Sequence, residues 1–136
     1  MIKKIAVLLA SVLFISSIAA SQEKSLSFSD VVDKLNLTKK TALAVKTNWQ
    51  EMMGQEVTWT GKVVNVVGGK AKADIYAANK DRSTYRGYNI VLETYDIQGA
   101  SKLDIGKNIK FKGVLSDYKG RKGRPIVIYL NSVELK

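Results

Sequence analysis

The residues of this chain best suited to recognition chemistry lie in a short basic segment near its C-terminal end. Residues 119–125 read KGRKGRP. Arg121 and Arg124 offer forked guanidinium donors that match a phosphate or a carboxylate. The two glycines allow backbone N–H groups to approach a ligand closely. Because Lys119 and Lys122 add two more positive charges, the segment predicts a loop that binds an anionic group.

A second basic segment contains tyrosines. Residues 62–86 hold six basic and two acidic side chains, and residues 107–124 hold seven basic and one acidic. From residue 21 onward, the rest of the chain has a small acidic excess, so nearly all the positive charge falls in these two windows. Tyrosine rings beside cations can stack on bases or sugars. The predicted ligand-binding residues are Lys119, Arg121, Lys122, Arg124, Lys70, Lys72, Arg82, Arg86, Tyr76, Tyr85 and Tyr88.

Ordinary surface chemistry is the alternative for each of these residues taken singly. Lysines in turns are usually solvated, and Lys on a short exposed strand discourages pairing with another edge. Tyrosines in strands often pack half-buried. The concentration of charge in two windows nevertheless favours binding of an anion.

The composition excludes several enzyme chemistries. The chain has no His and no Cys, so the usual zinc sites, histidine bases, Ser-His-Asp triads, Cys-His pairs and disulfides cannot form. The aspartates that could hold a metal are scattered, and most adjoin predicted turns, where Asp is common: Asp74, Asp81, Asp96, Asp104 and Asp117. We predict no catalytic residue, no metal site and no cofactor.

The first twenty residues have the pattern of a secretory signal peptide. Two lysines precede an apolar run at 5–15, and small residues follow. The uncharged stretch is only about the minimum length that spans a bilayer, so we expect cleavage after Ala19, Ala20 or Ser21 and no remaining transmembrane span. The absence of Cys excludes a lipid-anchored cysteine. The exported chain would be periplasmic or secreted, with a formal charge of +8.

The elements that must position the basic windows begin with a helical segment within residues 21–53, after a polar leader. Its apolar residues have helical spacing in two groups, which are Phe28, Val31, Val32 and Leu35, then Ala42, Val45, Trp49 and Met52. Ser29 and Thr38 are predicted N-caps, and Gly54 is a predicted stop. We expect the apolar face to pack on the protein's own sheet. The alternative is that it docks on another chain.

Residues 54–136 change to the period-two pattern of strands. We expect strands at 56–67, 70–78, 85–93, around 109–115, and from 126 toward 135, with a helical turn near 100–103. The valines at 63, 64, 66 and 67 indicate that both faces of the first strand are buried at its end. In the third strand, we expect Tyr88, Ile90 and Leu92 to lie on the same face.

Two of these strands carry the same short pattern. Residues 54–61 read GQEVTWTG and residues 106–113 read GKNIKFKG. The apolar and aromatic residues would point into one core, and the second glycine of each segment would allow a sharp bend. Two bent strands among five predict a small closed barrel, which leaves no exposed edge.

The chain therefore resembles an OB-fold, on the segments VTWTGKVVNV, NIVLE, LDIGKNIKFKGVL and IVIYLNSVEL. It is most similar to small exported bacterial proteins of the tRNA-anticodon-binding-like (tRNA_anti-like) family, over residues 54–135. The resemblance implies a mainly β fold, a five-stranded barrel preceded here by a short N-terminal helical segment. It also implies a binding face on the second and third strands, flanked by loops near 67–70 and 117–125.

These expectations favour a non-enzymatic binding module of the bacterial envelope. Its partner would be an anionic envelope component, such as a phosphate-bearing glycan or a lipid head group, or an acidic protein. A single-stranded nucleic-acid binder is the alternative. An exported OB-fold nuclease with clustered carboxylates is a third hypothesis, and the scattered aspartates disfavour it.

Overall fold

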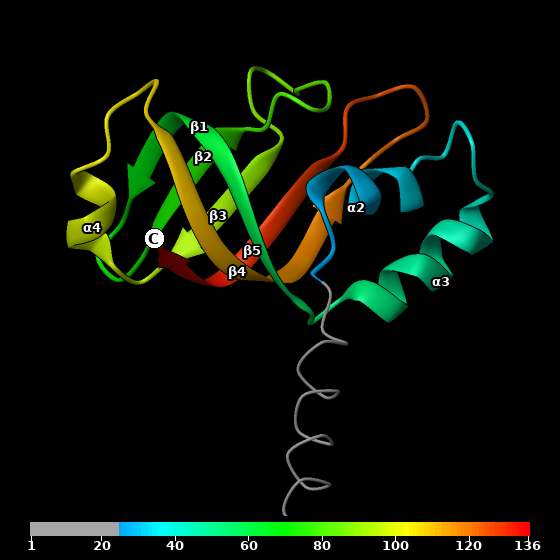
Figure 1. The fold of residues 1–136 in the computed structure, drawn as a ribbon, viewed down its shortest axis with the longest axis horizontal. Helices are drawn as coiled ribbons and strands as arrows, with labels where there is room; N and C mark the ends of the chain where they lie inside the picture. The colour runs from blue at the N-terminus through cyan, green and yellow to red at the C-terminus, as the bar shows by residue number, and fades with distance from the viewer. Residues whose placement is uncertain (1–24) are drawn as a thin grey trace, which may run out of the picture.

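The structure is a computed structural model that describes residues 25–136, so the predicted signal peptide at 1–20 lies outside the described residues. Its elements are α2 (Phe28–Lys34), α3 (Ala42–Met52), β1 (Glu56–Gly68), β2 (Ala73–Ala78), β3 (Ile90–Thr94), α4 (Ile97–Ser101), β4 (Asn108–Lys119) and β5 (Val127–Leu135) (Figure 1). The strands close into a barrel in the order β1-β2-β3-β5-β4. The predicted five-stranded, mainly β barrel is confirmed. Among residues 25–136, none of the helices could span a lipid bilayer.

Helices α2 and α3 begin at caps other than those predicted. The Ser27 hydroxyl accepts a hydrogen bond from the Asp30 N–H at 3.0 Å and caps α2, in place of Ser29. Thr41 caps α3 in place of Thr38. Helix α3 begins after Thr38 because residues 36–38 form a local turn, in which the Asn36 side chain accepts a hydrogen bond from the Thr38 N–H at 2.9 Å.

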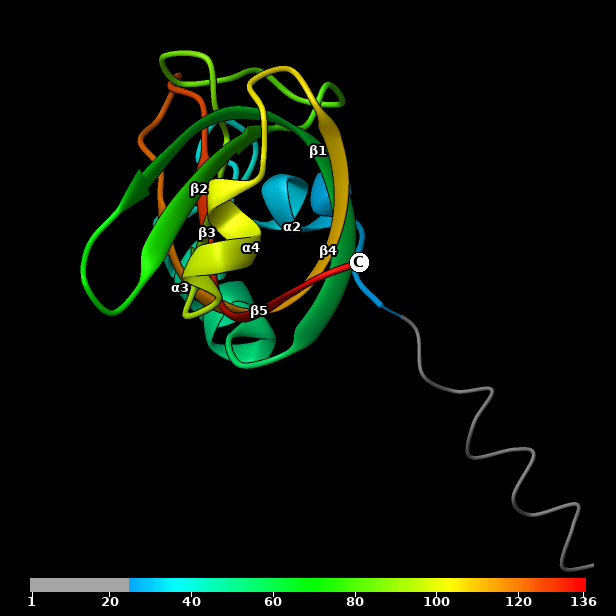
Figure 2. The same ribbon diagram turned by 90° about the vertical axis from the view of Figure 1, so that its left-hand side faces the viewer.

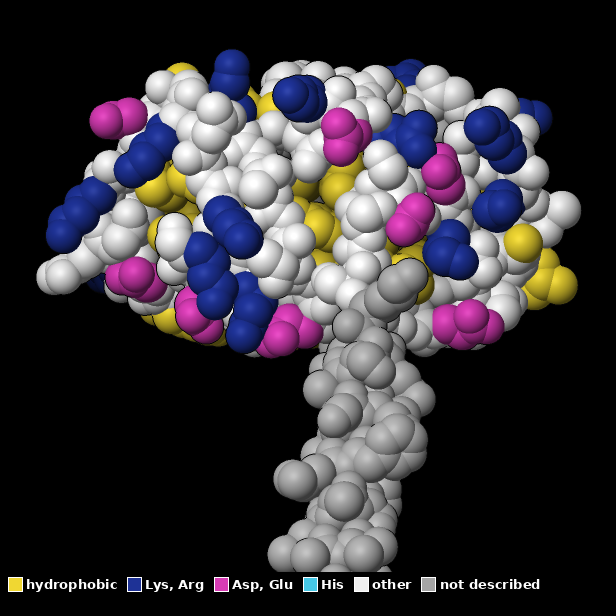
Figure 3. All heavy atoms as spheres, in the orientation of Figure 1, with side chains coloured by type: hydrophobic (Ala, Val, Ile, Leu, Met, Phe, Trp, Pro, Cys, Tyr) yellow, Lys and Arg dark blue, Asp and Glu magenta, His cyan; other side chains and the backbone are white. Residues whose placement is uncertain are grey.

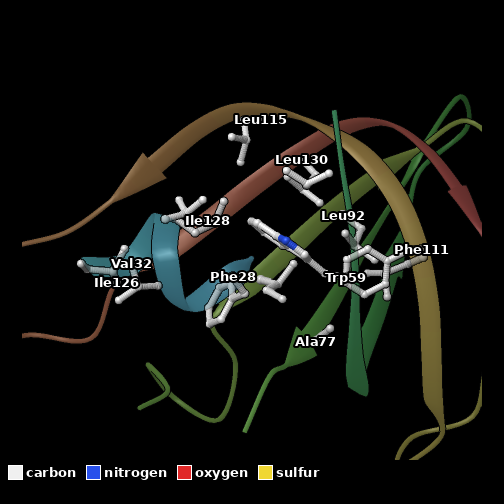
Figure 4. Close-up of a cluster of buried hydrophobic side chains, with 14 of the residues drawn as sticks. Phe28, Val32, Trp59, Ala77, Leu92, Phe111, Leu115, Ile126, Ile128 and Leu130 are labelled. Atoms are coloured by element: carbon white, nitrogen blue, oxygen red, sulfur yellow. The ribbon is translucent and has the colours of Figure 1, made fainter. Parts of the chain in front are cut away.

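Helix α2 closes one end of the barrel core. Phe28 and Val31 are buried in the same cluster as the inward residues of the strands. The Phe28 and Trp59 rings meet edge to face with centroids 5.3 Å apart (Figure 4). The Trp59 indole N–H also donates to the Leu26 carbonyl at 2.8 Å. The helical segment therefore packs on its own barrel.

The two glycine-flanked segments pair with each other in antiparallel fashion around Trp59 and Phe111, which are direct cross-strand partners. The second glycine of each segment lies opposite the apolar residue of the other. Gly61 faces Ile109, and Gly113 faces Val57. The seam between β1 and β4 consequently has approximate local two-fold symmetry.

The two inner glycines lie where the barrel wall is crowded. A Cβ at Gly61 would lie 3.2 Å from the Ala77 Cβ, and one at Gly113 would lie 3.1 Å from the Leu130 Cβ. Close approach of neighbouring strands therefore explains the glycines in the bent strands.

The end of β1 departs from the predicted burial on both faces. A register shift between Val63 and Asn65 interrupts the pairing with β2. Val64, at the shift, and Val66, beyond it, are half-buried, and Val67 is 53% exposed. Beyond the bulge Val66 still packs against the core and Val67 faces solvent, so the four valines do not form a doubly buried run.

Two other boundaries also differ. Strand β2 begins at Ala73, because a turn closed by the Gly69 N–H donating to the Lys72 carbonyl precedes it. The helical turn predicted at 100–103 is α4, which begins earlier because the Asp96 carboxylate accepts from the Gly99 N–H at 2.9 Å.

Candidate functional site

The strand directions place two loops at the same end of the barrel. Strand β3 runs parallel to β5 and antiparallel to β2. The β2–β3 loop (79–89) and the β4–β5 loop (120–126) must therefore both lie where β3 and β5 begin. The two loops rise next to each other above the barrel in Figures 1 and 2. The β1–β2 turn lies at the opposite end of these strands.

A pocket of about 670 Å³ lies between these two loops. Its lining residues are Tyr85, Tyr88, Tyr118, Lys119, Gly120, Arg121, Arg124, Pro125, Val127 and Tyr129. Four of these side chains are tyrosines and three are cations. None of the lining residues, all within the described range 25–136, is acidic. The pocket thus combines aromatic faces with an excess of positive charge, and Asp117 is the acidic residue that lies near Lys119.

The tyrosines form a connected cluster. The Tyr88 ring meets the Tyr76 ring edge to face at 4.8 Å and the Tyr85 ring at 5.9 Å. On the outer face of the barrel, Val91 of β3 is the strand partner of both Tyr76 and Tyr129. Burial raises the pKa of Tyr88 above its ordinary value, and the neighbouring Tyr129 raises that pKa further. Tyr88 is therefore neutral and fixed among rings.

Cations lie over two of these rings. The Arg86 guanidinium is 5.3 Å from the Tyr85 ring centroid, and the Lys119 ammonium is 5.5 Å from that of Tyr129. Interaction with the Tyr129 hydroxyl raises the pKa of Lys119 above its ordinary value. Lys119 therefore stays charged at the pocket wall, at any pH near neutrality.

A tight turn places Tyr85 and Tyr88, and it corrects the predicted third strand. Arg86 has φ 52° and Gly87 has φ 92°. The Tyr85 N–H donates to the Tyr88 carbonyl at 2.7 Å across this turn. Positive φ at both central residues is typical of a type I′ turn. Tyr88 consequently leaves the face that Ile90 and Leu92 share, and lies over the outer surface instead.

Two side chains hold the β2–β3 loop in place. Asn89 is fully buried, and its amide nitrogen donates to the carbonyls of Asn79, Arg82 and Ser83 at 2.9, 3.2 and 3.3 Å. Arg82 forms an ion pair with Asp33 of α2 at 2.7 Å. The pocket wall is therefore tied to the barrel core and to the helical segment.

The other predicted site residues are separated from the pocket or stand at its margin. Lys70 and Lys72 lie at the opposite end of the barrel, and Lys72 is paired with Glu93 at 2.9 Å. Lys122 is exposed in the β4–β5 loop but does not line the pocket. In Figure 3, Lys and Arg side chains spread among Asp and Glu over the whole visible face. The two basic windows therefore do not merge into one patch there.

Two pocket tyrosines, Tyr118 and Tyr129, are not among the residues predicted from the sequence. The signal for Tyr129 was present, because Ile128 and Leu130 alternate inward and leave the residue between them facing outward. Tyr118 meets the Trp49 ring of α3 at 4.9 Å, a contact that strand periodicity does not reveal. Among residues 25–136, no three acidic side chains lie close enough to hold a metal ion.

Comparison with known proteins identifies the fold. No family model and no curated protein matches the sequence. Among solved structures, one from Klebsiella pneumoniae, named a putative nucleic acid-binding lipoprotein, matches with a TM-score of 0.55 and 10% identity, over 87% of this chain and 95% of that one. The barrel topology and this match support an OB-fold. The narrower tRNA-anticodon-binding-like family stays a prediction.

Two further matches are more distant. An OBody bound to hen egg-white lysozyme has a TM-score of 0.44 and 11% identity, over 62% of this chain and 84% of that one. Pot1pC of Schizosaccharomyces pombe bound to single-stranded DNA has a TM-score of 0.35 and 12% identity, over 74% and 84%. Neither carries an argument about the site.

Proposed function

We propose that this protein is an exported, non-enzymatic binding module whose pocket between the β2–β3 and β4–β5 loops takes an anionic ligand. The observation that carries the proposal is the pocket lining, in which Lys119, Arg121 and Arg124 occur with four tyrosines and without a carboxylate. A guanidinium or ammonium at such a site binds phosphate or carboxylate oxygens through charge-assisted hydrogen bonds. The tyrosines supply apolar contact for the rest of the ligand.

The source of the ligand follows from export. The signal pattern of residues 1–20 would bring the chain into contact with phosphate-bearing glycans, lipid head groups and acidic proteins of the envelope. Mass measurement of protein recovered outside the cytoplasm should give a chain that starts after residue 19, 20 or 21. A full-length chain retained in the cytoplasm would contradict the export step.

The binding step is tested with two charge-matched double variants. Arg121→Gln with Arg124→Gln changes the pocket, whereas Lys70→Gln with Lys102→Gln removes two charges at the far end. Both are compared for retention on immobilised heparin and on phosphatidylglycerol vesicles at increasing salt. The pocket variant should elute at clearly lower salt than the control, because specific contacts add to general attraction. Equal elution would show that the pocket does not bind anions.

Single-stranded nucleic acid is the second candidate ligand. It is favoured by the tyrosine cluster, since bases stack on aromatic side chains, and by the name of the Klebsiella neighbour. Gel-shift titration with an oligonucleotide at two salt concentrations tests it. Binding should weaken steeply as salt rises, and no shift at low salt would end this candidate.

A further inference from the structure

The outer face of β2 and β3 is divided into two chemically different halves. Near the loops, the outward residues are Tyr76 and Val91, with Tyr129 of β5 beside them. Toward the β1–β2 turn, the outward residues are Asp74 and Glu93, which are direct strand partners. The only cation paired with them is Lys72, bound to Glu93 at 2.9 Å, in the part of the chain that the structure describes. The outward side chains Asp74 and Glu93 with the paired Lys72 thus have a formal charge of −1, and Lys70 lies in the adjoining turn.

This division limits how far an anionic ligand can extend along the barrel. A chain of phosphates that followed β2 and β3 away from the pocket would meet Asp74 and Glu93. Like charges at close range repel and, on a surface with few counter-charges, reduce affinity. The attractive part of the surface therefore ends at Tyr76.

The pocket itself is suited to a ligand with two parts. Tyr85 and Tyr88 of the β2–β3 loop and Tyr129 of β5 provide aromatic surfaces, whereas Arg121 and Arg124 come from the β4–β5 loop. A planar ring on the tyrosines would place an attached phosphate toward the guanidinium groups. A volume of about 670 Å³ lies within the range of roughly 300–1,000 Å³ that is common for small-molecule sites.

We infer, on the basis of the proposed function, that the ligand is compact: one planar ring joined to one phosphate, as in a nucleoside 5′-monophosphate, and not an extended single strand. The ring stacks on the tyrosine cluster. The phosphate receives hydrogen bonds from Arg121 and Arg124. The acidic half of the β2–β3 face excludes a continuing phosphate chain.

The experiment compares four probes on the chain purified after export. These are thymidine 5′-monophosphate, thymidine, deoxyribose 5-phosphate and a ten-nucleotide oligothymidylate. Binding is measured by calorimetry and by intrinsic fluorescence, since Trp49 contacts the pocket residue Tyr118. The monophosphate should bind at least about tenfold tighter than either fragment, because stacking and phosphate contacts are each needed. The ten-nucleotide strand should bind within about threefold of the monophosphate, with a similar salt slope.

Variants separate the two halves of the face. Asp74→Asn with Glu93→Gln should increase affinity for the ten-nucleotide strand and leave the monophosphate unchanged. Arg124→Gln should lower the affinity for thymidine 5′-monophosphate about tenfold or more and leave the affinity for thymidine unchanged. Tyr88→Phe keeps the ring and should retain binding, whereas Tyr88→Leu should lose it. Urea unfolding of both variants shows whether the loss of binding in Tyr88→Leu comes from misfolding.

The failing outcomes are distinguishable. A strand that binds about a hundredfold tighter than the monophosphate, with a salt slope that grows with its length, would overturn the compact ligand and leave the proposed function intact. Retention on heparin that depends on Arg121 and Arg124, with no response to any of the four probes, would also overturn it. If the unmodified protein bound neither heparin, nor phosphatidylglycerol vesicles, nor any of the four probes, the proposed function would be wrong as well.

Discussion

The side chain of Asn89 binds both backbone groups of Asn79. The Asn79 N–H donates to the Asn89 Oδ1 at 2.8 Å, and the Asn89 Nδ2 donates to the Asn79 carbonyl at 2.9 Å. Asn89 thereby replaces a strand partner for a loop that leaves the barrel. Together with the Arg82–Asp33 pair, this buried amide holds the loop that carries Tyr85 and Tyr88.

Replacing that amide should destabilise the protein. Asn89→Ala leaves the Asn79 N–H and three loop carbonyls without their partner, and an unsatisfied buried polar group costs about 1–3 kcal/mol. Urea unfolding measures the loss. Asn108→Ala, at an exposed residue of β4, serves as the control and should change the free energy of unfolding by no more than about 0.5 kcal/mol. Similar values for the two variants would contradict the structural role of Asn89.

The crowded β4 glycine gives a second prediction. In Gly113→Ala, the new Cβ would lie 3.1 Å from the Leu130 Cβ and 3.2 Å from the Val133 Cγ2. Overpacking of this kind should lower the free energy of unfolding by about 1–3 kcal/mol. Gly68→Ala is the matched control, because nothing lies within 4 Å of a Cβ there. If Gly113→Ala were as stable as the control, the close approach of β4 and β5 would be wrong.

The raised pKa of Tyr88 predicts a dependence of stability on alkaline pH. Burial favours the neutral phenol in the folded state. Above the ordinary tyrosine pKa of about 10, the unfolded chain therefore binds fewer protons than the folded one. The contribution of Tyr88 to the free energy of unfolding is therefore fully present below pH about 10 and is lost as the pH rises through the raised pKa of the folded state.

Unfolding in urea at neutral and strongly alkaline pH measures this effect. Tyr88→Phe should lose less stability between the two conditions than the unmodified protein. Tyr95→Phe, at a tyrosine that is 71% exposed, should behave like the unmodified protein. Identical losses in all three chains would show that packing among the rings does not raise the pKa of Tyr88.

Arg82 should act on the loop and not on the ligand. It pairs with Asp33 at 2.7 Å, with side chains 35% and 47% exposed. A double-mutant cycle with Arg82→Gln and Asp33→Asn should give a coupling of roughly 0.2–1 kcal/mol, as for other partly exposed pairs. Arg82→Gln should reduce heparin retention much less than Arg124→Gln. Zero coupling between Arg82 and Asp33, together with a strong loss of heparin retention in Arg82→Gln, would indicate that Arg82 binds the ligand directly.

The barrel was predictable from the sequence because its signals are local. Alternation in β1 and β4, and the glycines at 61 and 113, depend only on neighbouring residues and on the bends they allow. The prediction that Tyr88 shares a face with Ile90 and Leu92 was wrong, because the Arg86-Gly87 turn interrupts the strand that the sequence predicts at 85–93. A positive φ at arginine has no strong sequence signal.

The composition of the site was only partly predictable. The basic loop at 119–125 and the tyrosines at 85 and 88 do meet in one pocket. Their separation from Lys70 and Lys72 follows from the parallel pairing of β3 with β5. Pairing between strands distant in sequence is a tertiary property, and residue periodicity does not encode which end of the barrel a turn occupies.

The placement of β5 has a consequence for how the protein reaches its native state. This last strand lies between β3 and β4, so one edge of β3 and one edge of β4 stay unpaired until residues 127–135 have been synthesised and released. Contacts between distant segments form slowly, and open edges invite aggregation. A nascent chain that stops before Val127 should therefore be a substrate for chaperones and proteases, whereas the closed barrel of residues 56–135 exposes no strand edge to them.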